Sequence, residues 1–475
     1  MMNRLFIIIA LCCFSMQIHA QNNYVEKMKW WNEAKFGLFV HWGPYCLYGG
    51  MYHGYQQRRG GAEWIMNRCK IPVREYQATT TTFNPVDFNA EELVKMAKNA
   101  GMKYVVFTSK HHDGFAMYKS EVSKYNIYDF TPFKRDVVDE IAKACKKYDM
   151  KFGLYYSHAQ DWNHPGGAVC RKEMKEGWPA PDSVSIDKYS KEHKGAWDAL
   201  QTTRTYDEYF YNVALPQIKE LLQRYPDLAI LWFDTPAITK DSHAQAVTDL
   251  LKKYPNVIVN DRLKRPNYPG DYKTPEGRVP KAEDVKDVYW ETCMNVGSSW
   301  GWKSYEKHWK SSNDIIKTLI MCASRGGNLL LNVGPDPNGI VPHEAQESLA
   351  DVGKWLETYG EIIYGSQRSN IHPAWGECIR KDDKKHTNIY LCVYDWPENH
   401  QLIIPQALKV RKATMMNGGD VLKTKTADQQ TIVTLKERPE NEFVTVIKLE
   451  LRGKLSPINL KRNTDKFFEV VDEMK

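Results

Sequence analysis

Carboxylates, histidines and aromatic residues follow one apolar run after another in the first three quarters of the chain. Asp234 comes directly after the apolar run 229–233, so a strand there would carry the carboxylate at its end. Hydrolysis of a glycoside with retention needs two carboxyl groups on opposite sides of the anomeric carbon, one nucleophilic and one protonated. Asp234 suits the nucleophilic role, although an Asp at the end of a strand can also be an ordinary turn cap.

The aromatic content agrees with a sugar site. The 475 residues include 15 Trp and 27 Tyr. Flat aromatic rings pack well against the apolar C–H faces of sugars, and Trp and Tyr add a polar edge for hydroxyl groups. A large aromatic core would account for the same composition, so this content supports a sugar site only together with the motifs.

The elements that must position these residues form an alternating pattern. Between about residues 30 and 365, short apolar runs alternate with amphipathic stretches, which predicts an α/β fold with parallel strands. Helices are predicted after the capping residues Asn89 and Asp136, and from Ser312 to near Gly326. The predicted strands cover residues 36–40, 104–107, 151–155, 229–233, 257–259, 288–290 and 328–331.

Polar motifs follow nearly every predicted strand. They are HWG at 41–43, KHHDG at 110–114, YSHAQDW at 156–162, DTP at 234–236, NDR at 260–262, ETC at 291–293 and NVGP at 332–335. In a (β/α)8-like barrel these positions share the C-terminal mouth, where barrel enzymes keep their active sites. The sequence therefore predicts an α/β barrel-like catalytic domain over residues 21–365.

The pattern changes after about residue 366. Short alternating strands follow at 389–394, 431–435 and 443–451, with Asn417-Gly418-Gly419 as a turn and no convincing helix. Residues 366–475 are therefore predicted to form a separate C-terminal β-sandwich.

In order and spacing, the motifs of residues 27–365 resemble those of the glycoside hydrolase family 29 α-L-fucosidases. The matching segments are Trp30-Trp31, KFGLFVHWG at 35–43, Glu63-Trp64, KHHDGF at 110–115, LWFD at 231–234, NDR at 260–262, WETC at 290–293, SWG at 299–301 and GNLLLNVGP at 327–335. Several are weak alone, but the ordered set is specific. The resemblance implies an exo-acting, retaining α-L-fucosidase that releases terminal L-fucose from fucosylated oligosaccharides or glycoconjugates by double displacement, without a cofactor.

The resemblance also implies a fucose pocket around Asp234. Histidines and Glu63 would serve the sugar hydroxyl groups, and aromatic rings would face the C6 methyl group. Arg262 would lie near Asp234 and help to keep it ionised. The implied substrate-binding residues are His41, Glu63, Trp64, His111, His112, Tyr156, Trp232, Arg262 and Trp300.

Two glutamates compete for the acid/base role. Glu276 lies in a Pro- and Gly-containing loop that resembles the loop carrying the acid in some family members, and loops can reach over a bound sugar. Glu291 belongs to the stronger WETC motif, where its carboxylate could instead orient neighbours. Glu276 is the preferred acid/base residue and Glu291 is the alternative.

No metal ion or cofactor is expected. The pair His111-His112 could suggest a metal, but successive residues of an extended strand point to opposite faces, and no HxH, HExxH or cysteine cluster completes a site. The open alternatives are a retaining glycosidase with another specificity, such as one for galactosides, and a non-catalytic fucose-binding protein. A metal hydrolase is a more remote alternative.

The N-terminus has the order of a secretory signal peptide. Arg4 precedes an apolar run at 5–14 that is too short to span a bilayer, and a polar stretch ends at Ala20. We expect cleavage after residues 1–20, with lipidation of Cys12 or Cys13 as a minor alternative. A secreted protein of the bacterial periplasm is therefore predicted.

Charge and cysteine content limit the partners. The net charge of +7 is spread along the chain, which argues against nucleic acid or acidic lipid as a partner, and no later segment has the character of a membrane helix. Eight widely spaced cysteines lie outside the signal peptide, and most are expected to be buried apolar residues, with one or two disulfides possible. The oligomeric state has no signal in the sequence.

Overall fold

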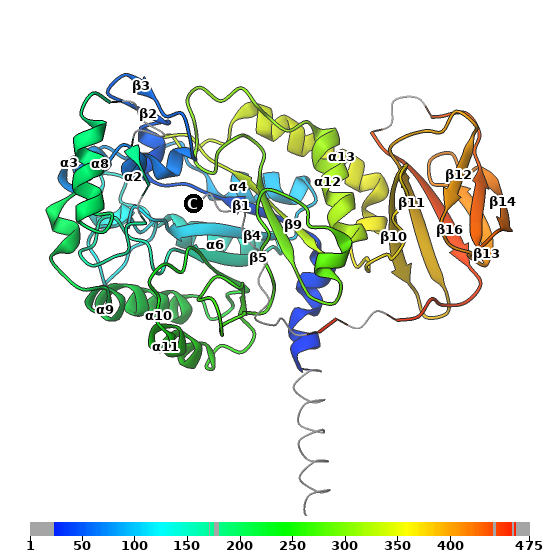
Figure 1. Ribbon diagram of the computed structural model, residues 1–475, viewed down its shortest axis with the longest axis horizontal. Coiled ribbons are helices and arrows are strands. Elements are labelled where there is room, and N and C mark those ends of the chain that lie inside the picture. The colour runs from blue at the N-terminus through cyan, green and yellow to red at the C-terminus, as the bar shows by residue number, and fades with distance from the viewer. Residues whose placement is uncertain (1–22, 171, 175–179, 440–442, 458–459, 462–475) are drawn as a thin grey trace, which may run out of the picture.

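Seven parallel strands curl into the wall of a barrel in the computed structural model, which describes residues 23–170, 172–174, 180–439, 443–457 and 460–461 (Figure 1). Around the wall the strands run in the order β7, β6, β5, β4, β1, β9, β8. They are β1 (Phe36–Val40), β4 (Tyr104–Lys110), β5 (Lys151–Tyr156), β6 (Ile230–Phe233), β7 (Ile258–Val259), β8 (Glu291–Asn295) and β9 (Asn328–Val333). The expected signal peptide lies outside the described residues.

An eighth, irregular segment closes the ring between β7 and β8. Residues 271–276 run parallel to both neighbours through the isolated bridges Asn260–Tyr272, Lys273–Trp290 and Glu276–Cys293. Pro275 has no backbone N–H to donate, which prevents a continuous ladder here. The predicted (β/α)8-like architecture is confirmed. Segment 271–276 takes the place of one strand and is paired only through isolated bridges.

The predicted strand 288–290 was misplaced. This apolar run precedes β8, and Glu291 is the first residue of the strand. Glu291 pairs in register with Asn328, the first residue of β9, so it lies at the N-terminal end of the barrel rather than at the mouth. Hydrophobicity could not locate β8 because this strand buries polar side chains.

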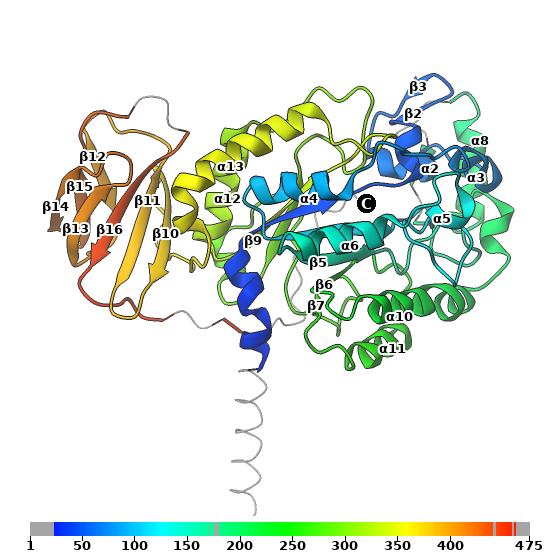
Figure 2. The same cartoon turned by 180° about the vertical axis from the view of Figure 1, so that it is seen from behind.

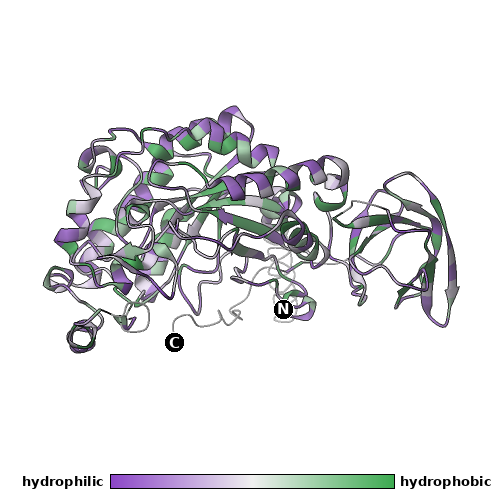
Figure 3. Ribbon diagram, turned by 90° about the horizontal axis from the view of Figure 1, so that it is seen from above, coloured by the Kyte–Doolittle hydropathy of each residue, from purple (hydrophilic) through white to green (hydrophobic). Residues whose placement is uncertain are grey.

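Alternation along the strands builds two cores. In β6, Leu231 and Phe233 belong to the core between the sheet and the helices. Ile230 and Trp232 belong instead to the core inside the barrel, which places Asp234, the next residue of that face, toward the interior of the mouth. Figure 3 shows the hydrophobic strands enclosed by helices with hydrophilic outer faces. The large aromatic residues inside the barrel include Trp31, Phe39, Tyr104, Tyr155, Trp232, Tyr272 and Tyr289.

Helices surround the barrel wall (Figure 2). They are α2 (Ile65–Arg68), α3 (Val73–Thr80), α4 (Ala90–Asn99), α5 (Ile127–Phe130), α6 (Val137–Lys147), α8 (Ser183–Glu192), α9 (Tyr206–Tyr209), α10 (Leu215–Arg224), α11 (Asp241–Leu251), α12 (Ser312–Ser324) and α13 (His343–Ile363). As predicted, side chains of Asn89 and Asp136 cap α4 and α6, and α12 begins at Ser312. The cap of α12 is Ser311, which the sequence had not indicated. Short 3-10 helices are η1 (Pro44–Leu47), η2 (Ala62–Trp64), η3 (Ala199–Thr202) and η5 (Ala282–Val285), and η4 (Phe210–Ala214) is a π-helix between α9 and α10. Strands β2 (Met51–Tyr52) and β3 (Tyr55–Gln56) form a small hairpin.

The C-terminal region is an antiparallel ladder that folds over its own core, which confirms the predicted sandwich. Its strands are β10 (Gly376–Asp382), β11 (Thr387–Val393), β12 (Gln401–Ile404), β13 (Val410–Met415), β14 (Val421–Ala427), β15 (Gln430–Thr434) and β16 (Thr445–Leu451). The order is β10, β11, β16, β13, β14, β15, β12, yet Leu391 of β11 and Leu402 of β12 share one core. The sandwich lies beside α12 and α13 (Figure 1).

Two further expectations concern membranes and cysteines. None of the described helices is long and apolar enough to cross a membrane. All eight cysteines of the described residues are free, and all except Cys170 are buried. Their predicted role as buried apolar residues is confirmed.

Candidate active site

Asp234 lies at the mouth of the barrel, one residue beyond β6. The Asn260 side chain fixes this strand end, since its Nδ2 donates to the Phe233 carbonyl at 2.8 Å and its Oδ1 accepts from the Phe233 N–H at 2.9 Å. Thr235 has a φ of +41°, in the left-handed region that β-branched residues rarely adopt, and its N–H donates to Asp234 Oδ1 at 2.9 Å. This sharp turn holds one oxygen of the carboxylate.

Arg262 joins Asp234 to a second carboxylate. Its Nη1 donates to Asp234 Oδ1 at 2.9 Å, and its Nη2 donates to Glu276 Oε2 at 2.7 Å. Nε donates to the Thr274 hydroxyl, and the guanidinium carbon lies 4.6 Å from the ring centre of Trp232. One buried guanidinium therefore holds the two carboxylates side by side.

The surroundings of Asp234 favour its ionised form. Burial would raise the pKa of this carboxyl, but the charge of Arg262, the nearby His112 and the hydrogen bonds from Arg262 and Tyr155 together bring the pKa below its usual value. The Tyr155 hydroxyl donates to Asp234 Oδ2 at 2.9 Å. A carboxylate that stays ionised is what nucleophilic attack requires.

Three histidines line the same cavity in the neutral form. Burial lowers the pKa of His41 to about 3, that of His112 to about 4, and that of His111 well below its usual value. His41 Nδ1 lies 2.8 Å from Asn332 Oδ1, and His112 Nδ1 lies 2.7 Å from Ser157 Oγ. A neutral imidazole has one donor and one acceptor, which suits sugar hydroxyl groups.

His111 and His112 both reach the cavity although they are neighbours in sequence. Strand β4 ends at Lys110, after a register shift between Thr108 and Lys110, and the chain then turns. The two imidazole rings lie 4.1 Å apart, and His112 Nε2 is 3.6 Å from Asp234 Oδ2. The alternation expected of an extended strand does not apply beyond its end.

Aromatic rings and one buried acid complete a cavity of about 440 Å³. Phe39, inside the barrel, lies 5.1 Å from Trp232 and 5.9 Å from Trp300 between ring centres. Glu63 is 1% exposed, and its Oε2 accepts the Gly301 N–H at 2.8 Å. Trp64 packs edge-on against His112. Apolar walls with a few fixed polar groups are typical of a small-ligand site, and the paired carboxylates give it hydrolytic chemistry.

Comparison with known proteins agrees with this chemistry. The sequence profile of the family described as Alpha-L-fucosidase matches residues 14–361. The chain belongs to the alpha-L-fucosidase family. It is 30% identical to the tissue alpha-L-fucosidase of Rattus norvegicus over 440 residues, which cover 87% of each chain. The resemblance to glycoside hydrolase family 29 is therefore confirmed, and the protein is a glycoside hydrolase by family.

Solved structures of alpha-L-fucosidases share the fold. One from Vibrio sp. strain EJY3 is 31% identical, with a TM-score of 0.76 over 90% of this chain and 73% of that one. A family 29 alpha-L-fucosidase from Bacteroides thetaiotaomicron, trapped as a covalent intermediate in complex with 2-fluoro-fucosyl fluoride, is 28% identical, with a TM-score of 0.76 over 90% of this chain and 96% of that one.

The structure corrects one predicted pocket residue of this alpha-L-fucosidase family member. Tyr156 points away from the cavity into the outer core, where its hydroxyl donates to Gln217 Oε1 at 2.7 Å. Tyr155 takes the place in the cavity. It pairs in register with Trp232 on the neighbouring strand, and paired residues of parallel strands share a face. The predicted residue was thus one position too far along β5.

Glu291, the alternative acid/base residue, does not line the cavity. It is fully buried inside the barrel, where the Tyr104 hydroxyl donates to its Oε2 at 2.5 Å. Burial raises the pKa of Glu291 to about 7, against the opposing effect of the Tyr104 and Tyr272 hydroxyl groups. The other predicted residues line one cavity, namely His41, Glu63, Trp64, His111, His112, Trp232, Asp234, Arg262, Glu276 and Trp300.

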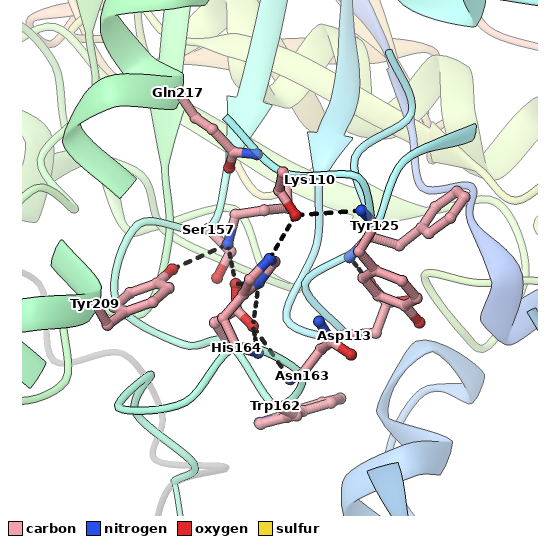
Figure 4. Close-up of polar contacts among 12 residues, drawn as sticks. Lys110, Asp113, Tyr125, Ser157, Trp162, Asn163, His164, Tyr209 and Gln217 are labelled. Atoms are coloured by element: carbon pink, nitrogen blue, oxygen red, sulfur yellow. Dashed lines mark hydrogen bonds and ion pairs between the residues drawn. The ribbon is translucent and has the colours of Figure 1, made fainter. Parts of the chain in front are cut away.

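A buried ionic cluster of Lys110, Asp161 and His164 links the end of β4 to the loop after β5 (Figure 4). Lys110 Nζ lies 2.8 Å from Asp161 Oδ2, and both side chains are fully buried. His164 Nδ1 lies 2.9 Å from the same oxygen. Next to Asp161, the Trp162 N–H donates to the His112 carbonyl at 2.7 Å. The cluster therefore fixes the loop after β4 relative to the loop after β5.

Several residues of the cavity were not predicted. Phe39 shares an inward face with His41, so strand alternation could have found it, whereas the inward face of Tyr155 depends on its register with Trp232 of the neighbouring strand. The loop residues had no readable pattern. The cavity residues that the sequence did not indicate include Phe39, Arg68, Tyr155, Lys172, Arg265, Arg278, Met294 and Asn295.

Proposed function

We propose that this chain is an exo-acting, retaining α-L-fucosidase that releases terminal L-fucose from fucosylated oligosaccharides or glycoconjugates. The observation that carries the proposal is the Arg262 guanidinium, which holds Asp234 and Glu276 together in the lining of the cavity at the barrel mouth. Retaining glycosidases keep their two carboxyl groups about 5 Å apart, whereas inverting enzymes need about 6.5–9.5 Å. Two carboxylates on one guanidinium fit the closer spacing.

Double displacement follows from this arrangement. Asp234 attacks the anomeric carbon while protonated Glu276 gives its proton to the glycosidic oxygen, and the leaving sugar departs. Glu276 then takes a proton from water, which attacks the same carbon and releases Asp234. The negative charge beside Arg262 moves from Asp234 to Glu276 in the first step and returns in the second, so the guanidinium has an anionic partner throughout.

The remaining groups of the cavity match fucose. Neutral His41, His111 and His112 can donate to some hydroxyl groups and accept from others. The rings of Phe39 and Trp300 offer apolar surface to the C6 methyl group. Because the cavity is closed by the barrel interior, the fucose must be a terminal residue, which supports exo action.

Replacing Asp234 by Asn tests the nucleophile. The variant should keep its fold and lose several orders of magnitude in turnover, since an amide cannot form the fucosyl ester. Mass spectrometry of the native enzyme after reaction with 2-fluoro-fucosyl fluoride should place the label on the peptide that contains Asp234. The exposed Asp241→Asn is the matched control. Near-normal turnover of folded Asp234→Asn would refute the assignment.

Product stereochemistry tests the mechanism independently. Two inversions retain configuration, so nuclear magnetic resonance during hydrolysis should show α-L-fucose before mutarotation produces the β-anomer. The β-anomer as the first product would indicate an inverting enzyme.

We also propose export to a bacterial periplasm, supported by the order of charge, apolar run and polar end in residues 1–20. The mature protein should start at Gln21 in N-terminal sequencing and be recovered by osmotic shock. A cytosolic protein that begins at residue 1 would contradict this.

A further inference from the structure

Several cationic side chains line the active-site cavity. The cationic lining, apart from Arg262, is Arg68, Lys172, Arg265 and Arg278. Within the described residues, the acidic lining is Glu63, Asp234 and Glu276. Glu63 accepts the Gly301 N–H and the other two acids share Arg262, so each acid has a partner deep in the cavity. Among the described lining residues, cationic side chains therefore outnumber acidic ones.

Arg278 is the most exposed of these cations, and its backbone is fixed. It follows Glu276 by two residues. The Gly277 N–H donates to the Cys293 carbonyl at 3.0 Å, and the Thr292 hydroxyl donates to the Arg278 carbonyl at 2.6 Å. The side chain makes no hydrogen bond or ion pair with any residue that the structure describes. A guanidinium on an anchored backbone is thus available to a ligand beside Glu276.

Arg265 lies on the same side of the cavity. Its side chain is 25% exposed, and its Nη2 lies 3.7 Å from Asp261 Oδ2. The charges of Asp234 and Glu276 also act on it. Because Glu276 must reach the glycosidic oxygen, the two arginines next to it border the leaving group rather than the fucose ring.

We propose that the leaving-group side of the cavity selects an anionic sugar, one that carries a sulfate ester or a carboxylate. This inference rests on the proposed fucosidase function and names its substrate class. A guanidinium offers paired N–H groups that match the oxygens of a sulfate or a carboxylate. A neutral leaving sugar would use mixed donors and acceptors, whereas an anionic one also supplies a counter-charge to Arg278, whose side chain has no hydrogen-bond or ion-pair partner among the described residues.

Three aryl α-L-fucosides test the proposal, with 4-sulfophenyl, 4-carboxyphenyl or uncharged 4-(methylsulfonyl)phenyl leaving groups. The readout is the ratio of kcat/KM for each charged substrate to kcat/KM for the neutral one, because intrinsic reactivity cancels when enzyme variants are compared. In Arg265→Gln/Arg278→Gln this ratio should fall about 5-fold to 20-fold for at least one anion, the size expected for two partly exposed ionic contacts. Lys281→Gln, on the same loop but outside the cavity, should keep the native ratio.

Salt provides a second measurement that needs no variant. With the native enzyme, raising sodium chloride from about 0.05 M to about 0.5 M should reduce the preference for the charged substrates, since exposed charges are screened. If the native enzyme cleaves all three substrates and its ratios respond neither to salt nor to the arginine changes, the anionic leaving group is refuted and the fucosidase function stands. If it cleaves none of them, the proposed function itself fails.

Discussion

At the scale of single residues, the hydrogen bond from Tyr155 to Asp234 gives a prediction about pH. This bond lowers the pKa of Asp234, so Tyr155→Phe should raise that pKa and move the acidic limb of the kcat/KM profile to higher pH. At neutral pH, kcat/KM should fall about tenfold, the effect of one hydrogen bond to a charged group. The pH dependence of aryl fucoside hydrolysis measures both effects.

Tyr156, which follows Tyr155 in the chain, provides the matched control. Tyr156→Phe removes a hydroxyl that bonds Gln217 in the outer core, so it should cost about 1 kcal/mol of stability and leave the acidic limb in place. If the acidic limb of the kcat/KM profile shifts in Tyr156→Phe and not in Tyr155→Phe, Tyr156 is the pocket residue, as the sequence suggested.

The two glutamates differ in their access to the sugar. Glu276→Ala should nearly abolish cleavage of natural fucosides yet spare the first step on activated aryl fucosides, because an aryl oxide leaves with little protonation. Azide should rescue this variant and yield α-fucosyl azide. Glu291→Gln, inside the barrel, should lose activity on both substrate types without rescue. If rescue by azide occurs with Glu291→Gln alone, the acid/base role belongs to Glu291.

The candidate site was predictable where a motif fixed both a residue and its face. Asp234 and Trp232 belong to the motif LWFD at the end of one apolar strand, so the pattern of this strand and the family resemblance together located them. Tyr156 was predicted wrongly because two adjacent tyrosines differ only in the face of β5 they occupy, which the register with β6 decides. Arg265 and Arg278 come from loops, whose paths depend on tertiary contacts that no local pattern encodes.

At the scale of elements, the buried pair Lys110–Asp161 positions His112 through the loops after β4 and β5. Lys110→Met should destabilise the protein by about 3–5 kcal/mol, because Asp161 would remain buried without its cation. Adding Asp161→Asn removes that uncompensated charge and should recover much of the melting temperature. We expect kcat/KM to stay about tenfold low in the double variant, since the loops lose their ionic link.

Thermal unfolding and kinetics of the same samples separate stability from positioning. Full recovery of kcat/KM together with the melting temperature would mean that the pair has only a structural role. The conservative Lys110→Arg should retain more activity than the double variant if the cation itself positions the loops.

Strands and helices were predictable to different degrees. The helices α4 and α6 begin at side chains whose capping chemistry is local, so the sequence located them. Strand β8 was displaced because it is not a continuous apolar run. Its Glu291 and Cys293 face the barrel interior among aromatic residues, and the Thr292 hydroxyl bonds backbone carbonyls. Segment 271–276 was not predicted as a strand at all, since it pairs only through isolated bridges.

At the scale of the whole molecule, Glu377 joins the sandwich to the barrel. This residue of β10 accepts from Ser324 Oγ at 2.7 Å and from Arg325 Nη2 at 3.0 Å, at the end of α12. Glu377→Ala would leave these partly buried donors unmatched, so calorimetry should show a loss of about 1–3 kcal/mol. Asp351→Ala breaks an exposed pair with Lys354 and should cost less than about 0.5 kcal/mol. Equal losses would mean that the contact does not couple the two parts.

The weak pairing of segment 271–276 determines where the barrel opens first. Its first residue, Asp271, is bound by Tyr24 and Lys27 of the N-terminal helical residues 23–34, with a 2.5 Å bond to its carbonyl and a 2.7 Å ion pair. The pairing of segment 271–276 with the barrel thus depends on contacts from the helical residues 23–34. Asp234 follows the regularly paired strand β6, whereas Glu276 belongs to the irregular segment 271–276. Backbone amides of segment 271–276 should exchange with solvent before those of β6. Each such opening would move Glu276, the proposed proton donor, away from Asp234, the proposed nucleophile, which stays in place.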